Sequence, residues 1–257
     1  MPSPMIEAKD TAIDKALRVL EVLNGDGDGR SLASIAAETG LPKTTVHRLL
    51  SILTQRGFAD RVHGGDYVVG RKIISLGLAA AEKDSLVNAA KPVLRHLVAL
   101  TQETVQLGVL HDMQLLYVDR MEPADSSIRL ARMPALMAEL HTSAMGKAIL
   151  AHSREEMIDA FLKMPLQRYT NHTTTDAAKL REELEEIRLS GVAMVDQDRY
   201  LGVKALGSPL LDNDGFAFAA ISVAGPAHRM DAITCGRIAE VLPEAARELS
   251  MLASMLH

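Results

Sequence analysis

Apolar residues recur at helical spacing near the start of the chain. The stretch TAIDKALRVLEVLN places Ile13, Leu17 and Leu20 on one side, which predicts an amphipathic helix. The glycine-rich run GDGDGR then predicts a loop. This run resembles a calcium loop only faintly, because the series of ligands and the closing glutamate are missing. We therefore expect no metal site in this loop.

Two further helices are predicted in the segment LASIAAETGLPKTTVHRLLS, residues 32–51. The preceding serine can cap the first helix, and Gly40 can end it because glycine tolerates a left-handed C-cap. Pro42 starts the second helix, where its missing N–H is not needed. The small residue Ala36, the glycine and the aliphatic Val46 have the relative spacing of a helix-turn-helix. An ordinary helical hairpin is the alternative.

The segment GFADRVHGGDYVVGR predicts a β-hairpin. Strand-like stretches at 58–63 and 66–69 flank Gly64-Gly65, a two-residue connection typical of hairpins. A hairpin directly after the second helix is a wing, so residues 11–70 predict a winged helix-turn-helix. The following residues, 71–86, predict an Ala- and Leu-rich linker helix, which either contacts a second subunit or packs on its own domain.

The exposed face of the helix that follows Pro42 carries side chains that can bond phosphates or base edges in a DNA major groove. The N–H groups at the helix start favour a phosphate, and two wing residues can reach a flanking one. For Arg48, a solvated helix position explains the residue equally well. The candidate DNA-binding residues are Lys43, Thr44, Thr45, His47, Arg48, Ser51, Arg61 and His63.

The charge distribution is compatible with this hypothesis. The net charge of −5 is unusual for a nucleic-acid-binding protein, but residues 30–72 carry a local excess of basic side chains. Chance clustering is the alternative explanation. With 257 residues, the chain is long enough for one large domain or two smaller ones.

The composition also bears on the compartment. No apolar stretch is long enough to span a membrane, and the first residues lack the pattern of a secretory signal. The single cysteine, Cys235, cannot form an internal disulfide and fits a reducing cytoplasm. We therefore expect a cytoplasmic protein without a membrane partner.

The remaining residues, 87–257, alternate predicted strands and helices, which indicates an α+β domain with an antiparallel sheet flanked by helices. Strands are expected within 106–121 (with a turn at His111-Asp112), 126–133 and 203–225. Helices are expected over 87–105 with Pro92 in the first turn, twice within 141–163 with Ser153 as the second cap, over 176–191, and over 231–256 with an interruption at Pro243.

Two features of this part favour a carboxylate site. The backbone N–H groups of residues 143–146 stand at a predicted helix start, where such groups lack partners and attract anions. In FAAISVAG, strand alternation places Ala220, Ser222 and Ala224 on one face, and Ser222 alone among them has a hydroxyl. A helix packed tightly over a strand of small residues is the alternative.

Five motifs, in this order and spacing, resemble the IclR family of bacterial transcriptional regulators over about residues 11–256. They are AIDKALRVLEVL, SLASIAAETGLPKTTVHRLLSILTQRGF, YVVG, HTSAMGKAILA and FAAISVAGPAHRM. The resemblance implies a winged N-terminal domain, a linker helix and a C-terminal GAF-like domain that binds a small organic or aromatic acid. It also implies homodimers or homotetramers that repress or activate transcription at operator DNA. The expected organisation is a flexible arm (1–10), the winged domain (11–70), the linker helix (71–86) and the GAF-like domain (87–257).

By the same resemblance, the effector site takes Ala144, Met145, Asp196, Ala205, Ser222 and Ala224. The first two would contribute their N–H groups, and the alignment of the acidic loop also allows Val195 or Asp198. Relatives often have Cys at the position of Ala205 and Ser at that of Ala224, so this pocket should be more apolar and roomier. Leu136, Met137 and Leu140 are candidates either for the cavity wall or for plain core.

Two other functions have to be weighed. A hydrolase could in principle combine His141, Asp196 and Ser222, but the chain has no G-x-S-x-G elbow and Ser222 is predicted within a strand. The histidines have no metal-ligand spacing, and no cofactor motif is present, so we expect no enzyme, metal or cofactor. A DNA-binding module whose second domain only oligomerises is the other alternative.

Overall fold

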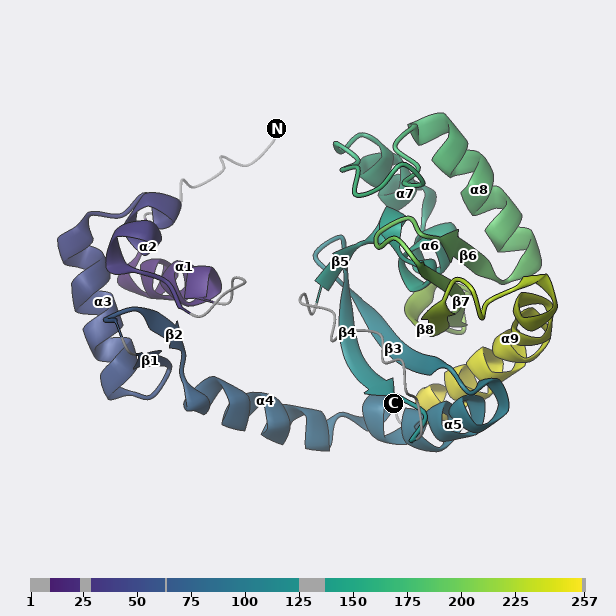
Figure 1. Cartoon of the computed structure of the whole chain (residues 1–257), viewed down its shortest axis with the longest axis horizontal. Coiled ribbons are helices and arrows are strands. Elements are labelled where there is room, and N and C mark those ends of the chain that lie inside the picture. Colours follow the sequence, from purple (N-terminus) through teal and green to yellow (C-terminus); the bar gives the residue numbers. More distant parts are fainter. Residues whose placement is uncertain (1–9, 24–28, 63, 125–136, 256–257) are drawn as a thin grey trace. The chain divides into compact units, whose positions relative to one another are not determined.

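The computed structural model describes residues 10–23, 29–62, 64–124 and 137–255. These residues form two compact units that are divided between Lys83 and Asp84, and Figure 1 shows their elements. Most of the predicted arm, the acidic residues of the predicted GDGDGR loop and the predicted strand at 126–133 lie outside the described residues.

The N-terminal unit contains three helices, a two-stranded sheet and a further helix. Its elements are α1 Ala12–Leu23, α2 Leu32–Thr39, α3 Lys43–Gln55, β1 Ala59–Arg61, β2 Tyr67–Val69 and α4 Arg71–Lys83. The two strands pair antiparallel as a wing, and the register aligns Ala59 with Val69 and Arg61 with Tyr67. Both strands are shorter than the sequence predicted.

The helix-turn-helix forms through the local signals read from the sequence. Ser31 caps α2 by accepting a hydrogen bond from the N–H of Ser34 at 3.1 Å. Gly40 ends the helix at φ 68° and ψ 10°, a left-handed conformation that suits glycine. Val46 and Ile35 are fully buried in a core shared by the first three helices and the wing.

The linker helix predicted over 71–86 ends earlier than expected, at Lys83, and the next helix begins at Ser85 instead of Val87. α4 has no buried residue among its described side chains, and Asp84 caps the next helix, α5 Ser85–Thr101, by accepting from the N–H of Val87 at 3.1 Å. Because α5 begins before Val87, Pro92 lies inside the helix rather than in its first turn, and that prediction was wrong.

The C-terminal unit is built on a six-stranded antiparallel sheet of order β5-β4-β3-β8-β7-β6. The strands are β3 Thr104–His111, β4 Gln114–Met121, β5 Met137–Glu139, β6 Ala193–Asp196, β7 Val203–Leu211 and β8 Ala217–Pro226. The predicted hairpins β3-β4 and β7-β8 are confirmed, whereas the short edge strands β5 and β6 were not predicted.

Helices cover both faces of this sheet (Figure 1). α5 and α9 Ala232–Ser254 share one apolar core with the sheet, and the sheet residues Ile221 and Val223 lie in that core. The other core joins the opposite face to α6 Ala144–Ala151, α7 Glu155–Leu162 and α8 Ala177–Ser190. The architecture is the α+β fold expected from the sequence.

Two helix details differ from the predictions. Arg154 rather than Ser153 occupies the N-cap of α7, because the Ser153 hydroxyl donates instead to the Ile149 carbonyl at 2.8 Å. Pro243 does not interrupt α9. A proline inside a helix removes one hydrogen bond, and the buried neighbours Leu242 and Ala246 hold both sides of it against the core.

No helix among the described residues is both long enough and apolar enough to cross a membrane.

Candidate functional site

One cavity in the C-terminal unit brings together five of the six predicted effector residues. The space that the centre of a water-sized sphere can occupy in it is about 30 Å³, and the empty volume, which includes solvent at its open side, is about 420 Å³. The five are Ala144, Met145, Ala205, Ser222 and Ala224. Ser143, Val195 and Asp198, which the sequence offered as a helix-start donor and as alternatives in the acidic loop, also line it. The lining residues that the sequence did not select are Gln106, Tyr117, Thr142, Arg199, Tyr200 and Val203.

The floor of the cavity is the centre of the sheet. Ser222 on β8 is aligned with Gln106 on one neighbouring strand, β3, and with Gly207 on the other, β7. Ala224 and Ala205 form the adjacent row. The predicted alternation along β8 is confirmed, since Ser222 and Ala224 line this cavity while Ile221 and Val223 enter the core on the opposite face.

The first turn of α6 forms one wall. The Ser143 hydroxyl caps this helix and accepts from the N–H of Gly146 at 3.0 Å, so that donor is occupied. No hydrogen bond among the described residues uses the N–H of Ala144 or of Met145. These two donors therefore remain available at a helix N-terminus, where the macrodipole favours an anion.

The Ser222 hydroxyl is a third available group. The residue is 2% exposed, and within the described part of the chain its hydroxyl has no hydrogen-bond partner. A buried hydroxyl without a partner costs free energy unless a ligand or water bonds it. The cavity is the space that such a partner would occupy.

The structure places Asp196 outside the cavity lining. Its carboxylate pairs with Lys204 at 2.9 Å, and the hydrogen bond from Lys204 is the main cause that lowers the pKa of Asp196. Val195 and Asp198, the two alternatives left open by the sequence, both line the cavity.

Asp198 belongs to a buried ionic network. Lys147 of α6, which is 3% exposed, donates to the carboxylates of Asp198 and of Glu183 on α8, each at 2.8 Å. The second oxygen of Asp198 accepts from the backbone N–H of Asp196 at 2.9 Å. The network therefore ties the loop after β6 to two helices, and the charge of Asp198 is already compensated.

Arg199, in the same loop, is held on the cavity wall by several partners. Its guanidinium pairs with Glu139 and lies over the rings of Tyr169 and Tyr200, 4.4 and 5.6 Å from their centroids. This loop has no regular pattern of polar and apolar residues, so Arg199 could not be selected from the sequence. Its positive charge, like the charge of Asp198, already has a partner.

Tyr117 on β4 contributes a neutral phenol to the wall. Burial raises the pKa of Tyr117 to about 12, and the nearby Arg199 opposes the shift only in part. At neutral pH the phenol is therefore protonated.

Gln106 on β3 is a further lining residue that the sequence could have indicated, since it is a polar residue within the mostly apolar strand TVQLGVL.

The other residues weighed from the sequence lie elsewhere. Leu140 is buried in the core beside α6, Met137 lies in β5, neither lines the cavity, and Leu136 is outside the described residues. The Nε2 of His141 lies 3.0 Å from the carbonyl oxygen of Gln167. Where the structure describes the chain, no cluster of His, Cys, Asp or Glu could hold a metal ion.

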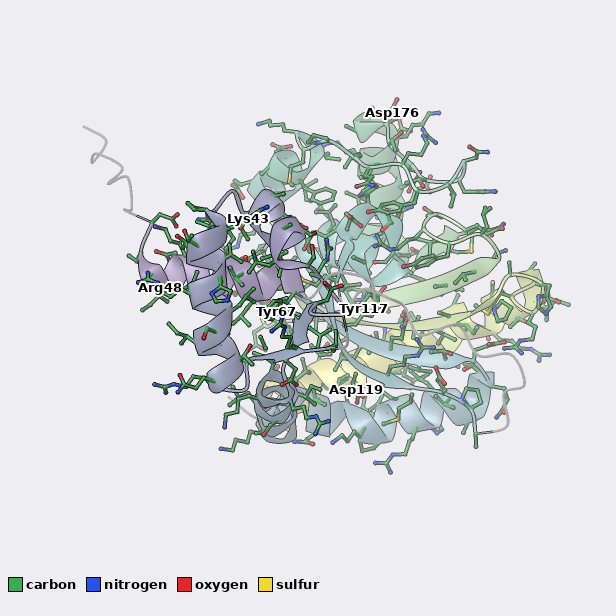
Figure 2. All side chains as sticks on the ribbon, turned by 60° about the vertical axis from the view of Figure 1, so that its left-hand side comes forward. Lys43, Arg48, Tyr67, Tyr117, Asp119 and Asp176 are labelled. Atoms are coloured by element: carbon green, nitrogen blue, oxygen red, sulfur yellow. The ribbon has the colours of Figure 1, made fainter. Side chains whose placement is uncertain are left out.

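The second candidate surface is α3 of the N-terminal unit. Figure 2 labels Lys43 and Arg48 along this helix, with Tyr67 on the wing. The side chains of Lys43, Thr44, His47, Arg48 and Ser51 are exposed, and Thr45 is half-buried. The N–H of Thr45 donates to the carbonyl of Pro42 at 2.9 Å, so it is not free for a phosphate as the sequence suggested.

The wing supplies one more cation. The Arg61 side chain is exposed, its guanidinium lies 5.8 Å from the centroid of the Tyr67 ring, and its Nε donates to the carbonyl of Gly65 at 3.4 Å. These contacts hold the charge at the wing. His63 is outside the described residues.

Two family models match the chain. Residues 12–63 match the IclR helix-turn-helix domain, and residues 78–251 match the bacterial transcriptional regulator IclR C-terminal domain. The transcriptional regulator BhcR of Paracoccus denitrificans is 36% identical, and the match covers 93% of this chain and 86% of BhcR. The transcriptional repressor IclR of Escherichia coli is 30% identical, and the match covers 93% of this chain and 89% of that repressor.

Solved structures agree on the fold. The IclR-type regulator from Alicyclobacillus acidocaldarius superposes with a TM-score of 0.84 at 25% identity, and the match covers 94% of this chain and 98% of that one. An IclR homologue from Microbacterium hydrocarbonoxydans was solved in complex with 4-hydroxybenzoate. It superposes with a TM-score of 0.77 at 24% identity, and the match covers 95% of this chain and 100% of that one.

Proposed function

Because the chain belongs to the IclR family of bacterial transcriptional regulators, it is a DNA-binding regulator and not an enzyme, and we propose that a small organic acid bound in the C-terminal cavity modulates its binding to operator DNA. Such a regulator works where bacterial DNA lies, in the cytoplasm.

One observation carries the proposal: three donors without partners in the described part of the chain border the cavity. The N–H groups of Ala144 and Met145 and the hydroxyl of Ser222 can each donate to a carboxylate. Hydrogen bonds to a charged acceptor in a water-poor site are stronger than those to a neutral one. The apolar residues Ala205 and Ala224 leave room beside them for an apolar body.

A relative's ligand gives further support. The homologue from Microbacterium hydrocarbonoxydans is complexed with 4-hydroxybenzoate, so aromatic acids belong to the set of candidate effectors. A bound acid changes DNA affinity only as far as it distinguishes two conformations, which allows an effect of about 1–3 kcal/mol.

For DNA we propose that α3 enters the major groove. Lys43 and Arg48 would contact phosphates or bases from the exposed face, with Thr44, Thr45, His47 and Ser51 beside them and with Arg61 and His63 from the wing. A homodimer or homotetramer would present two such helices to the half-sites of a near-palindromic operator.

A calorimetric titration of the full-length protein tests the effector site. The probes are acetate, butanoate and benzoate, with butylamine and benzylamine as cationic counterparts. We expect at least one acid to bind and neither amine to do so. Ser222→Ala should weaken the acid about 10-fold or more, since a hydrogen bond to a charged group is lost.

The matched control is Ser254→Ala, whose hydroxyl bonds only within its own helix, to the carbonyl of Ser250. That variant should bind the acid like the wild type. If none of the acids binds, the proposed acid site is contradicted, and a second domain that only oligomerises becomes the favoured alternative. Unchanged affinity in Ser222→Ala would contradict the pocket assignment but not the role as a regulator.

A further inference from the structure

Gln106 is a buried polar side chain without a partner. It lies within β3, is 4% exposed and lines the cavity. Its side-chain amide takes part in no hydrogen bond among the described residues. An amide has two donor hydrogens and an acceptor oxygen, and leaving them unbonded in the interior is costly. Water or a ligand in the cavity would supply the partner.

The sheet register fixes where this amide stands relative to the proposed carboxylate site. Gln106, Ser222 and Gly207 are aligned on three neighbouring strands, β3, β8 and β7. Gly207 lies under the first turn of α6, beside the backbone of Ala144 and Met145. Since adjacent strands are about 5 Å apart, the backbone of Gln106 is one strand spacing from Ser222 and two from Gly207.

The charges on the cavity wall indicate which kind of ligand group the Gln106 amide would hydrogen-bond. Arg199 pairs with Glu139, and Asp198 pairs with Lys147, so the two charged lining residues are both compensated. A second carboxylate on the ligand would find no free cation there, and Asp198 would repel it. A neutral group that accepts or donates a hydrogen bond avoids this cost, and the neutral phenol of Tyr117 is a further partner for it.

Building on the proposed function, we infer that Gln106 selects the effector class: monocarboxylic acids that carry a neutral hydroxyl, carbonyl or amide about one strand spacing from the carboxylate. The α6 terminus and Ser222 hold the carboxylate, and Gln106 holds the second group. Plain apolar acids and dicarboxylates are discriminated against, because they leave the Gln106 amide unbonded or add an uncompensated charge.

Three acids of similar shape test this selection on the full-length protein. 4-Methylpentanoate has an apolar end, succinamate has a neutral amide at the same place, and succinate has a second carboxylate. Benzoate and 4-hydroxybenzoate form a second pair. We expect the wild type to bind succinamate more tightly than both matched acids, or 4-hydroxybenzoate more tightly than benzoate. The difference in affinity should be about 5- to 10-fold, which corresponds to one buried hydrogen bond.

The substitution Gln106→Leu separates recognition from a structural role. It should remove the preference while leaving affinity for the apolar acid equal or higher, and Gln106→Glu should weaken all acids by charge repulsion. Gln102→Leu is the matched control, since Gln102 is exposed at the end of α5. If Gln106→Leu keeps the preference, or weakens polar and apolar acids equally, the inference is overturned. If the wild type binds none of these acids, the proposed effector class itself fails, and this inference fails with it.

Discussion

Gly207 of β7 lies so close to the first turn of α6 that a Cβ built on it would come within 2.6 Å of the backbone carbon of Ala144. The same added atom would stand 2.8 Å from the backbone nitrogen of Met145. Backbone atoms cannot give way as a flexible side chain can. A glycine on the central sheet therefore sets how near the helix terminus comes to the cavity floor.

Gly207→Ala should push α6 away from the sheet. Overpacking of this kind costs about 1–3 kcal/mol of stability, and the displaced N–H groups should bind acids less tightly. Urea unfolding and titration with benzoate measure the two effects. Gly236→Ala is the control, because nothing lies within 4 Å of its added Cβ and alanine favours a helix interior. Equal stability and acid affinity in Gly207→Ala and the wild type would contradict this account.

Lys43→Ala and Arg48→Ala should weaken DNA binding. A lost phosphate contact lowers affinity for all sequences and reduces the salt slope by about one, whereas a lost base contact costs about 1–3 kcal/mol at one position. The measurement is fluorescence anisotropy, at several salt concentrations, with duplexes that the protein enriches from a random library. Arg247→Ala removes an equal charge from an exposed position on α9 and should change little. Wild-type binding in both α3 variants would exclude this helix from recognition.

Lys147→Met should destabilise the C-terminal unit. Removing one partner of a buried ion pair costs about 3–5 kcal/mol, and the lower end applies here because Glu183 is partly exposed. Urea unfolding gives the value. Adding Asp198→Asn should recover part of the loss, since it removes the charge left unpaired. A double variant no more stable than Lys147→Met would show that the two residues do not act as a pair.

Stability should fall as the pH is lowered from about 7.5 to 5.5. Burial lowers the pKa of both His141 and His152 below the ordinary value of 6.5. The unfolded chain therefore binds more protons in this range, and the free energy of unfolding decreases as the pH falls. Thermal unfolding across the range measures the slope, which should be smaller in His141→Gln/His152→Gln. An unchanged slope would assign the pH dependence to other groups.

The exposed apolar residues of α4 predict self-association. Ile73, Ile74 and Leu76 are all exposed on a helix that has no buried residue among its described side chains, while the side chain of Leu78 is outside the described part. Sedimentation should give at least twice the monomer mass of 27.8 kDa. Ile74→Lys should shift the equilibrium toward the monomer, and Ile233→Lys, on an exposed position of α9, should not. A wild-type monomer at micromolar concentration would contradict this prediction.

Local signals decided which parts of the fold the sequence could predict. Ser31 and Gly40 act within a few residues of their own position, so the caps of α2 were correct. β5 and β6 have only three and four residues, too few for alternation to be recognised, and they form because a long neighbouring strand offers them an edge.

The residues of the candidate site also divide into those that local sequence signals identify and those that long-range contacts place. Ala144, Met145 and Ser222 were selected because a helix start and a strand face can be read from consecutive residues. Arg199 and Asp198 lie in an irregular loop whose path depends on the buried Lys147, and no periodic pattern describes such a segment. The resemblance left Asp198 open as an alternative, but the position of both residues on the cavity wall depends on these tertiary contacts.

The order of the sheet has a consequence for synthesis on the ribosome. The two wing strands pair with each other over a short stretch of the N-terminal unit, whereas β3, near the start of the C-terminal unit, pairs with β8 near its end. Contacts of short sequence separation form early, and an N-terminal unit folds first during translation. We expect the nascent chain to fold α3, the helix proposed to contact DNA, well before the cavity exists. Until β8 has emerged, the cavity proposed to bind the effector has no floor, so a newly made molecule would not respond to the proposed acid.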